Sequence, residues 1–188
     1  SGIAKNGTPV SRMAGGNRMG SKEDLTLIDT NIFVIDLRYK RDVNYRSNLA
    51  FLDTVAQRGT GFTTLINLLE LCGILSFNLN EKQLFDLWRH FQKRYKVTVL
   101  PLADMVSDFP GFPIGDLFEQ FQKKISLGDA LMLTIAKKRL SFITTLVTWD
   151  RDHFKDKFPG TVITPHEYIT SHPDKPEKFK AESSKQKT

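Results

Sequence analysis

Residues 25 to 33 read L-T-L-I-D-T-N-I-F, two apolar runs separated by Asp29. The first run, Leu25 to Ile28, has the length and composition of a short buried strand. Asp29-Thr30-Asn31 then supplies side chains that can cap the start of a helix, which continues through the second run. The stretch therefore predicts a strand that ends on a carboxylate and turns at once into a helix.

Elements on the C-terminal side of this junction alternate between helical and strand patterns. Helices are expected over 47–57, 64–77, 81–95 and 126–139, in the segment that carries Ile114 and Leu117, and for a turn or two over 150–158. Strands are expected at 61–64, 97–101, 143–148 and 161–164. Strands separated by helices predict a three-layer α/β/α domain with a mainly parallel central sheet, whose ligand sites lie at the carboxyl ends of the strands.

Length and composition predict one domain flanked by two polar tails. A chain of 188 residues can form one sizeable core and is short for two. Residues 1–24 are expected to be disordered, and the first eighteen resemble a remnant of an expression tag, so that Met19 is a candidate start. The folded domain is expected over residues 25–170, and residues 171–188 are expected to form a disordered, Lys-rich tail.

The sequence predicts a cytoplasmic protein without a membrane segment. Cys72 is the only cysteine, so an intrachain disulfide is excluded and a reducing compartment is favoured. The longest apolar stretch, Leu65 to Phe77, contains Glu70 and is shorter than the roughly 20 residues that a spanning helix needs. The N-terminal residues lack the apolar core of a signal peptide.

The net charge of +6 is concentrated outside the predicted domain. Residues 1–24 carry four basic and two acidic groups, and residues 171–188 carry five and three. The remaining 146 residues are nearly balanced, with 18 basic and 16 acidic groups. Charge alone therefore does not indicate a nucleic-acid-binding surface on the domain.

Four carboxylates occupy positions that a simple soluble fold would not require. Asp29 and Asp150 each follow a predicted strand, so both should lie at the same edge of a parallel sheet. Glu70 interrupts a helix that is apolar almost all round, where a lone buried carboxylate is costly unless it has a partner or lies at the rim. Asp129 follows Ser126 in the spacing S-L-G-D, which places it in the first turn of a helix.

Each of these acids also has an ordinary structural explanation. Asp29, Asp129 and Asp150 can stabilise helix starts, and Glu70 can pair with an Arg or Lys. Together they can converge on one pocket, where Mg²⁺ or Mn²⁺ bound by oxygen would relieve their repulsion. The sequence has no Cys or His cluster for zinc, and its histidines are scattered and expected at the surface: His90, His153, His166 and His172. The stretch G-T-G-F-T-T lacks the Lys of a phosphate-binding loop.

Four segments in order resemble a known family. These are I-D-T-N-I-F, T-T-L-I-N-L-L-E-L, L-G-D-A-L-M-L-T-I-A and L-V-T-W-D-R-D-H-F. Their order, spacing and predicted secondary structure resemble PIN-domain nucleases, the group that contains VapC-type toxins, over about residues 25–170. The resemblance implies an acidic metal site formed by Asp29, Glu70, Asp129 and Asp150, with Asp152 as an auxiliary acid and Asn31 and Thr148 as polar neighbours.

This resemblance implies a ribonuclease that uses one or two Mg²⁺ or Mn²⁺ ions to activate a water and to stabilise the phosphate during in-line displacement. It also implies an RNA substrate, a possible small antitoxin partner and a homodimer. Cations that could border the site and contact phosphates are Arg38, Lys40, Arg41, Arg46, Arg89, Lys93, Arg94 and Arg151. A solvated helix face is the alternative explanation for each of them.

The chain departs from a compact family member between residues 101 and 125, which include F-P-G-F-P. The aromatic side chains there could pack in the core, close a dimer or cover an RNA cleft: Phe109, Phe112, Phe118 and Phe121.

Two other functions remain as alternatives. A haloacid-dehalogenase-type phosphatase would require D-x-D, whereas this chain has Asp29-Thr30-Asn31. A non-catalytic PIN-like scaffold that binds RNA or protein would be expected to lose the acids, which are all present.

Overall fold

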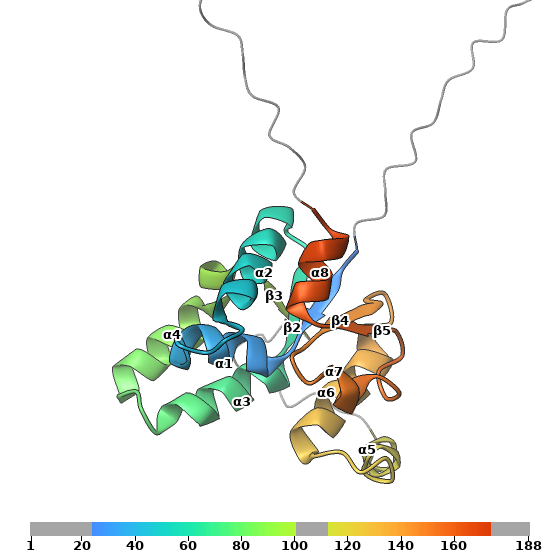
Figure 1. The fold of residues 1–188 in the computed structure, drawn as a ribbon. Helices are drawn as coiled ribbons and strands as arrows, with labels where there is room; N and C mark the ends of the chain where they lie inside the picture. The colour runs from blue at the N-terminus through green and yellow to red at the C-terminus, as the bar shows by residue number, and fades with distance from the viewer. Residues whose placement is uncertain (1–23, 101–112, 174–188) are drawn as a thin grey trace, which may run out of the picture.

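The computed structural model describes residues 24–100 and 113–173, which form a central sheet with helices on both faces (Figure 1). The strands are β1 (Thr26–Ile28), β2 (Gly61–Thr64), β3 (Thr98–Leu100), β4 (Thr145–Val147) and β5 (Thr161–Ile163). The helices are α1 (Thr30–Arg38), α2 (Tyr45–Arg58), α3 (Leu65–Ser76), α4 (Glu81–Tyr95), α5 (Ile114–Phe121), α6 (Leu127–Arg139), α7 (Arg151–Phe154) and α8 (Pro165–Ser171).

The sheet has the order β3-β2-β1-β4-β5, and every neighbouring pair in it is parallel. β1 therefore lies at the centre, with Leu27 opposite Phe62 of β2 and Ile28 opposite Val147 of β4. The predicted α/β class with a mainly parallel sheet is confirmed. Because β1 and β4 are parallel neighbours in register, their carboxyl ends meet at one edge.

Alternate residues of the central strand face two different cores. Ile28 belongs to a core that includes Phe33 of α1 and Phe51 of α2, and that extends to α3, α4 and α8. Leu27 belongs to a second core on the other face, which includes Met132 of α6 and Phe154 of α7. The sheet is thus covered by helices on both sides, which gives the three predicted layers.

Turn and capping residues fix where the elements near the site begin and end. α2 ends at Gly59, whose φ of 67° places it in the left-handed region that glycine adopts without strain. Thr64 caps α3 through a capping box with Asn67. Gly61 opens β2 at a point where the side chains of Val55 and Val97 leave no space for a Cβ atom.

Helix α8 is the one described helix that the sequence analysis does not predict. Its start is encoded in T-P-H-E, because Thr164 caps the helix, Pro165 occupies the first turn and Glu167 completes a capping box. The helix is short and has few apolar residues, which gives little helical periodicity. Buried Tyr168 nevertheless anchors it, with its ring centroid 5.0 Å from that of Phe51 on α2.

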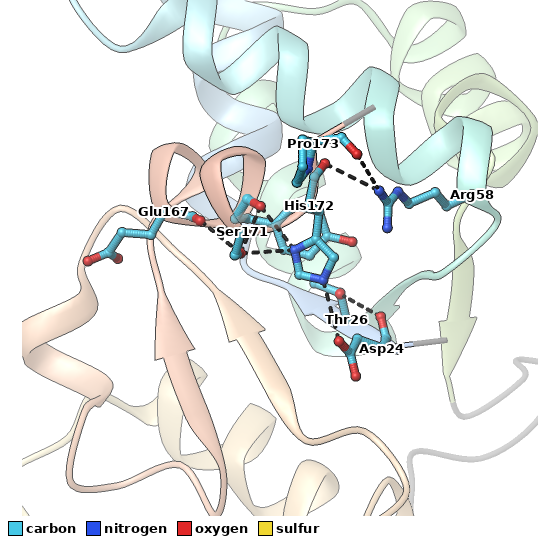
Figure 2. Close-up of polar contacts among 8 residues, drawn as sticks. Asp24, Thr26, Arg58, Glu167, Ser171, His172 and Pro173 are labelled. Carbon is cyan, nitrogen blue, oxygen red and sulfur yellow. Dashed lines mark hydrogen bonds and ion pairs between the residues drawn. The ribbon is translucent and has the colours of Figure 1, made fainter. Parts of the chain in front are cut away.

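Polar contacts fasten the end of α8 beside α2 and the entrance to β1 (Figure 2). The ring of His172 stacks on Tyr168 with centroids 4.2 Å apart, and its Nε2 lies 3.4 Å from Asp24 Oδ2. The Arg58 guanidinium donates to the backbone oxygens of His172 and Pro173 at 3.2 and 3.4 Å. The first and last described segments are therefore neighbours.

Several sequence-based expectations fall on residues 1–23, 101–112 and 174–188, outside the described residues. Phe109 and Phe112 are among them. The alternative of core packing is wrong for Phe118 and Phe121, which are 59% and 39% exposed on α5. Among the described residues, no helix is long and apolar enough to cross a membrane.

Candidate active site

Asp29 lies at the carboxyl end of β1 and is only 6% exposed. Its Oδ1 accepts the backbone N–H of Thr30 at 2.7 Å, which is the predicted N-cap contact for α1. Its Oδ2 accepts the hydroxyl of Thr148 at 2.7 Å, directly after β4. The Asn67 side-chain amide donates to Oδ1 at 3.4 Å. Asp29 is therefore held from three elements at once.

Burial raises the pKa of the Asp29 carboxyl to about 7, chiefly because the ionised form loses its water. The hydrogen bonds from Thr148 and Thr30 act in the opposite direction and lower this pKa. The negative charges of Asp129 and Glu70 raise it further. Two carboxylates that are far away in the sequence are thus close enough to Asp29 to affect its ionisation.

Glu70 lies at the rim, which is one of the alternatives that its sequence context left open, and not in the interior of its apolar helix. It is exposed at the rim, as is the neighbouring Leu69, which is 44% exposed. The Thr30 hydroxyl donates to Glu70 Oε2 at 2.5 Å and in turn accepts from Asn67 Nδ2 at 2.9 Å. A Cβ atom at Gly128 would lie 3.4 Å from Glu70 Oε1, so Glu70 also borders the start of α6.

Asp129 has the capping partner that the sequence predicts. Its backbone N–H donates to Ser126 Oγ at 3.2 Å, and the Ser126 hydroxyl donates to Asp129 Oδ2 at 2.7 Å. His153 Nε2 lies 3.2 Å from the same Oδ2, and this side chain is 28% exposed. The expectation of an ordinary surface histidine is therefore wrong for His153. The sequence offers only its position in D-R-D-H-F beside Asp150 as a signal.

Thr148 links Asp29 with two other predicted residues. While it donates to Asp29, its Oγ1 accepts from Asn31 Nδ2 at 2.9 Å and from the backbone N–H of Asp150 at 3.0 Å. Asn31 Oδ1 accepts the backbone N–H of Trp149 at 3.3 Å. Asn31 and Thr148 thus connect the ends of β1 and β4 beside Asp29.

Asp150 is an exposed residue at the same edge of the sheet. Although it precedes α7, its side chain makes no capping hydrogen bond, so the capping explanation is wrong for Asp150. Its side chain has no hydrogen-bond or ion-pair partner within 24–100 and 113–173. Asp152 is almost fully exposed and lies 3.6 Å from Arg151 Nε. The two acids after β4 are therefore accessible.

The predicted cations fall into engaged and available groups. Arg151 Nη1 pairs with Glu167 Oε1 at 2.5 Å, and Arg94 Nη2 lies 3.7 Å from Asp36 Oδ2. The Arg38 guanidinium lies 5.6 Å from the ring centroid of Tyr39. In the described part of the chain, the other candidates are exposed and form no ion pair: Lys40, Arg41, Arg46, Arg89 and Lys93.

The donor atoms suit a hard divalent cation, because they are carboxylate oxygens without thiol or imidazole clusters. Burial and, to a smaller extent, the charges of Asp129 and Glu70 raise the pKa of Asp29, and a cation would offset these charges. As the side chains stand, no three His, Cys, Asp or Glu residues of the described segments form a metal-binding group. Hydroxyl groups donate instead to Asp29, Glu70 and Asp129.

Comparisons with known proteins give matches at the level of structure. No protein-family model matches the chain, and no curated protein matches it. A chain of the crystal structure of VapBC2 from Rickettsia felis bound to a DNA fragment from their promoter is 22% identical, with a TM-score of 0.50, over 74% of this chain and 97% of that one. A chain of FitAcB from Neisseria gonorrhoeae is 21% identical, with the same TM-score and coverage. These matches show that the chain has a fold like that of a VapBC component, in line with the VapC-type resemblance of its sequence.

Proposed function

We propose that the protein is a metal-dependent ribonuclease whose acidic site comprises Asp29, Glu70, Asp129 and Asp150. The observation that carries the proposal is Asp29 at the carboxyl end of β1, whose pKa is raised to about 7 chiefly by burial and further by the charges of Asp129 and Glu70. A buried acid with a raised pKa at the ligand-binding edge of an α/β sheet is typical of a functional site.

A bound Mg²⁺ or Mn²⁺ would supply an acidified water and neutralise charge on the phosphate. The chain's own residues prepare the carboxylates for this role. Thr148 and Thr30 fix the two oxygens of Asp29, and Asn31 fixes Thr148. The Ser126 hydroxyl donates to Asp129 Oδ2, and His153 Nε2 lies 3.2 Å from the same oxygen. Asp150 and Asp152 remain accessible at the rim, where Asp152 would act as an auxiliary acid.

The position of Asn31 favours a nuclease over the phosphatase alternative. A dehalogenase-type site would place a second carboxylate there, whereas the Asn31 amide donates to Thr148 and its oxygen accepts from Trp149. A charged acid at this position would lose the donor contact to Thr148. The non-catalytic scaffold is disfavoured because Asp29 is kept buried although its ionisation is costly.

The proposal includes an RNA substrate, a small antitoxin partner and a homodimer in the cytoplasm. The fold shared with VapBC2 supports the antitoxin partner, and the lone, half-buried Cys72 agrees with a reducing compartment. Three exposed apolar side chains support self-association: Ile114 and Phe118 on α5 and Leu127 at the start of α6, which are 83%, 59% and 58% exposed.

Cleavage of a labelled single-stranded RNA by the full chain tests the proposed activity. We expect cleavage with Mn²⁺ or Mg²⁺, none with EDTA and none for Asp29→Asn. Asp53→Asn, at an exposed position of α2, is the matched control and should cleave like the parent. Equal cleavage by Asp29→Asn and the parent would contradict the proposal.

A further inference from the structure

We infer that the connection between α1 and α2 binds single-stranded RNA, with Tyr39 as a stacking platform for a base and the surrounding cations as phosphate contacts. This cationic loop comprises residues 38–46. The inference rests on the proposed ribonuclease function, because it adds a second point of substrate contact to the carboxylate site. The loop has charge, an exposed aromatic ring and a direct connection to that site.

The charge of the cationic loop is unbalanced, and Lys40, Arg41 and Arg46 are available for contacts. It contains the four basic residues Arg38, Lys40, Arg41 and Arg46 and one acidic residue, Asp42. None of the four cations forms an ion pair with a described residue. Asp42 Oδ1 accepts the backbone N–H of Asn44 at 2.7 Å, so this carboxylate is directed to the backbone of the loop. Exposed cations without partners are the groups that contact phosphates.

Tyr39 presents its ring from an ordered turn. The residue is 48% exposed, and the Arg38 guanidinium covers part of the ring at 5.6 Å from its centroid. The Tyr39 backbone N–H donates to Ile35 O at 3.0 Å, and its carbonyl accepts the N–H of Asp42 at 2.9 Å. Because these hydrogen bonds hold the backbone in place, little further ordering is needed when a base stacks on the ring.

Helix α1 connects the cationic loop to the carboxylate site. Asp29 caps its first turn and Arg38 ends it, so its nine residues separate the two places by about 14 Å along the helix axis. Asn31, Val34 and Arg38 share one face of this helix and are all at least partly exposed. A strand whose reacting phosphate lies near Asp29 can therefore follow this face to the loop.

The surface at the loop suits an unpaired base better than a duplex. A hollow of about 510 Å³ is lined by Leu37 and residues 38–42, which include Tyr39 and three of the cations. Aromatic rings interleaved with cations are the combination that binds single strands, because any unpaired base can stack while the cations contact its backbone. A solvated charged loop would not require the half-exposed ring of Tyr39 among its cations.

Binding of a fluorescein-labelled oligouridine tests the stacking role. Anisotropy titrations of the full chain in EDTA measure affinity without cleavage. We expect Tyr39→Leu to weaken binding about fivefold or more, and Tyr39→Phe to preserve it. Phe85→Leu is the matched control, because Phe85 is an aromatic residue of α4 that is 57% exposed, and it should bind like the parent. Equal affinities for Tyr39→Leu and Phe85→Leu would overturn the inference.

The salt dependence of the same titrations tests the phosphate contacts. Arg38→Gln/Arg41→Gln should lower the slope of log affinity against log salt by about 1.4, whereas Tyr39→Leu should leave it unchanged. Lys82→Gln/Lys137→Gln removes two exposed cations elsewhere and should keep the parent slope. An unchanged slope for the Arg38/Arg41 variant, or tighter binding of duplex RNA than of the single strand, would overturn the inference.

A cleavage assay on the same proteins separates this inference from the proposed function. If the parent fails to cleave RNA with Mn²⁺ but loses binding on Tyr39→Leu, the cationic loop is confirmed as a binding surface and the nuclease proposal fails. If the parent cleaves and Tyr39→Leu binds normally, the nuclease proposal stands and the loop is excluded.

Discussion

The hydroxyl of Thr148 donates a hydrogen bond of 2.7 Å to Asp29 Oδ2 and thereby joins the carboxyl ends of β4 and β1. Both residues are buried, and they are 119 positions apart in the chain. Such a bond favours the ionised form of a carboxylate that burial otherwise disfavours. Thr148 therefore lowers the pKa of Asp29, against the larger effect of burial.

Thr148→Val should destabilise the protein at pH 8 by about 1–3 kcal/mol, because the ionised Asp29 would lose a buried hydrogen-bond donor. Thr148→Ser keeps the hydroxyl and should lose less. Urea unfolding of both variants measures the difference. If the Thr148→Val and Thr148→Ser variants had the same free energy of unfolding, the hydrogen bond from Thr148 to Asp29 would have no energetic role.

The stability of the metal-free protein should fall as the pH rises from about 4 to above 7. The pKa of Asp29 is about 7 in the folded protein against 3.8 for an ordinary Asp, so over this interval the folded state binds more protons than the unfolded state. The stabilisation is complete below the pKa that Asp29 has in the unfolded chain, and it is lost above the pKa that Asp29 has in the folded protein. The full shift corresponds to a loss of up to about 4 kcal/mol.

Asp29→Asn cannot ionise and should lack this component of the pH dependence. Urea unfolding of the parent and the variant in EDTA at acidic and alkaline pH measures the difference, and the variant should be the more stable protein at pH 8. A parent and a variant that lose stability equally between these pH values would show that Asp29 is not the titrating group.

Tyr95→Phe should lower the stability by about 1–3 kcal/mol, because the Tyr95 hydroxyl donates to Asp36 Oδ2 at 2.7 Å. Burial, together with the neighbouring Asp36, raises the pKa of Tyr95 and keeps the hydroxyl protonated. Tyr39→Phe, at a half-exposed ring, should have almost no effect on the melting temperature. Similar melting temperatures for the two variants would contradict the assigned contact.

Two glycine variants test the packing of the sheet against the helices. Gly61→Ala should lower the free energy of unfolding by about 1–3 kcal/mol, because the new methyl group would overlap the side chains of Val55 and Val97. Gly73 lies in α3 with open space around it. Gly73→Ala should raise the free energy of unfolding by about 0.5–1 kcal/mol, because alanine has the higher helix propensity. Denaturant unfolding measures both, and an unchanged stability for Gly61→Ala would contradict the close packing at β2.

The residues that predict the fold act locally. L-T-L-I-D-T-N-I-F specifies both β1 and α1, because its strand length, its N-cap and its apolar spacing all agree with the structure. Helix α8 escapes prediction because it is short and mostly polar, and only T-P-H-E marks its start. Local patterns thus define the long elements better than the short ones.

The candidate site depends more on long-range arrangement. Parallel strands predict that Asp29 and Asp150 lie at the same edge of the sheet. The pairing of β1 with β4 agrees with this prediction. The exposure of Glu70 does not follow from its apolar helix, because it depends on which side of α3 lies at the rim. The contact between Asp129 and His153 depends on the placement of α7 beside α6, which no local pattern encodes.

The most direct test of a shared acidic site is the thermal stabilisation by Mg²⁺ of the parent and of Asp129→Asn, with Asp53→Asn as the control. In EDTA, Asp129→Asn should melt at a higher temperature than the parent, because one source of repulsion on Asp29 is removed. Mg²⁺ should then stabilise the parent and Asp53→Asn more than Asp129→Asn. Equal stabilisation of all three proteins by Mg²⁺ would contradict a metal site shared by these carboxylates.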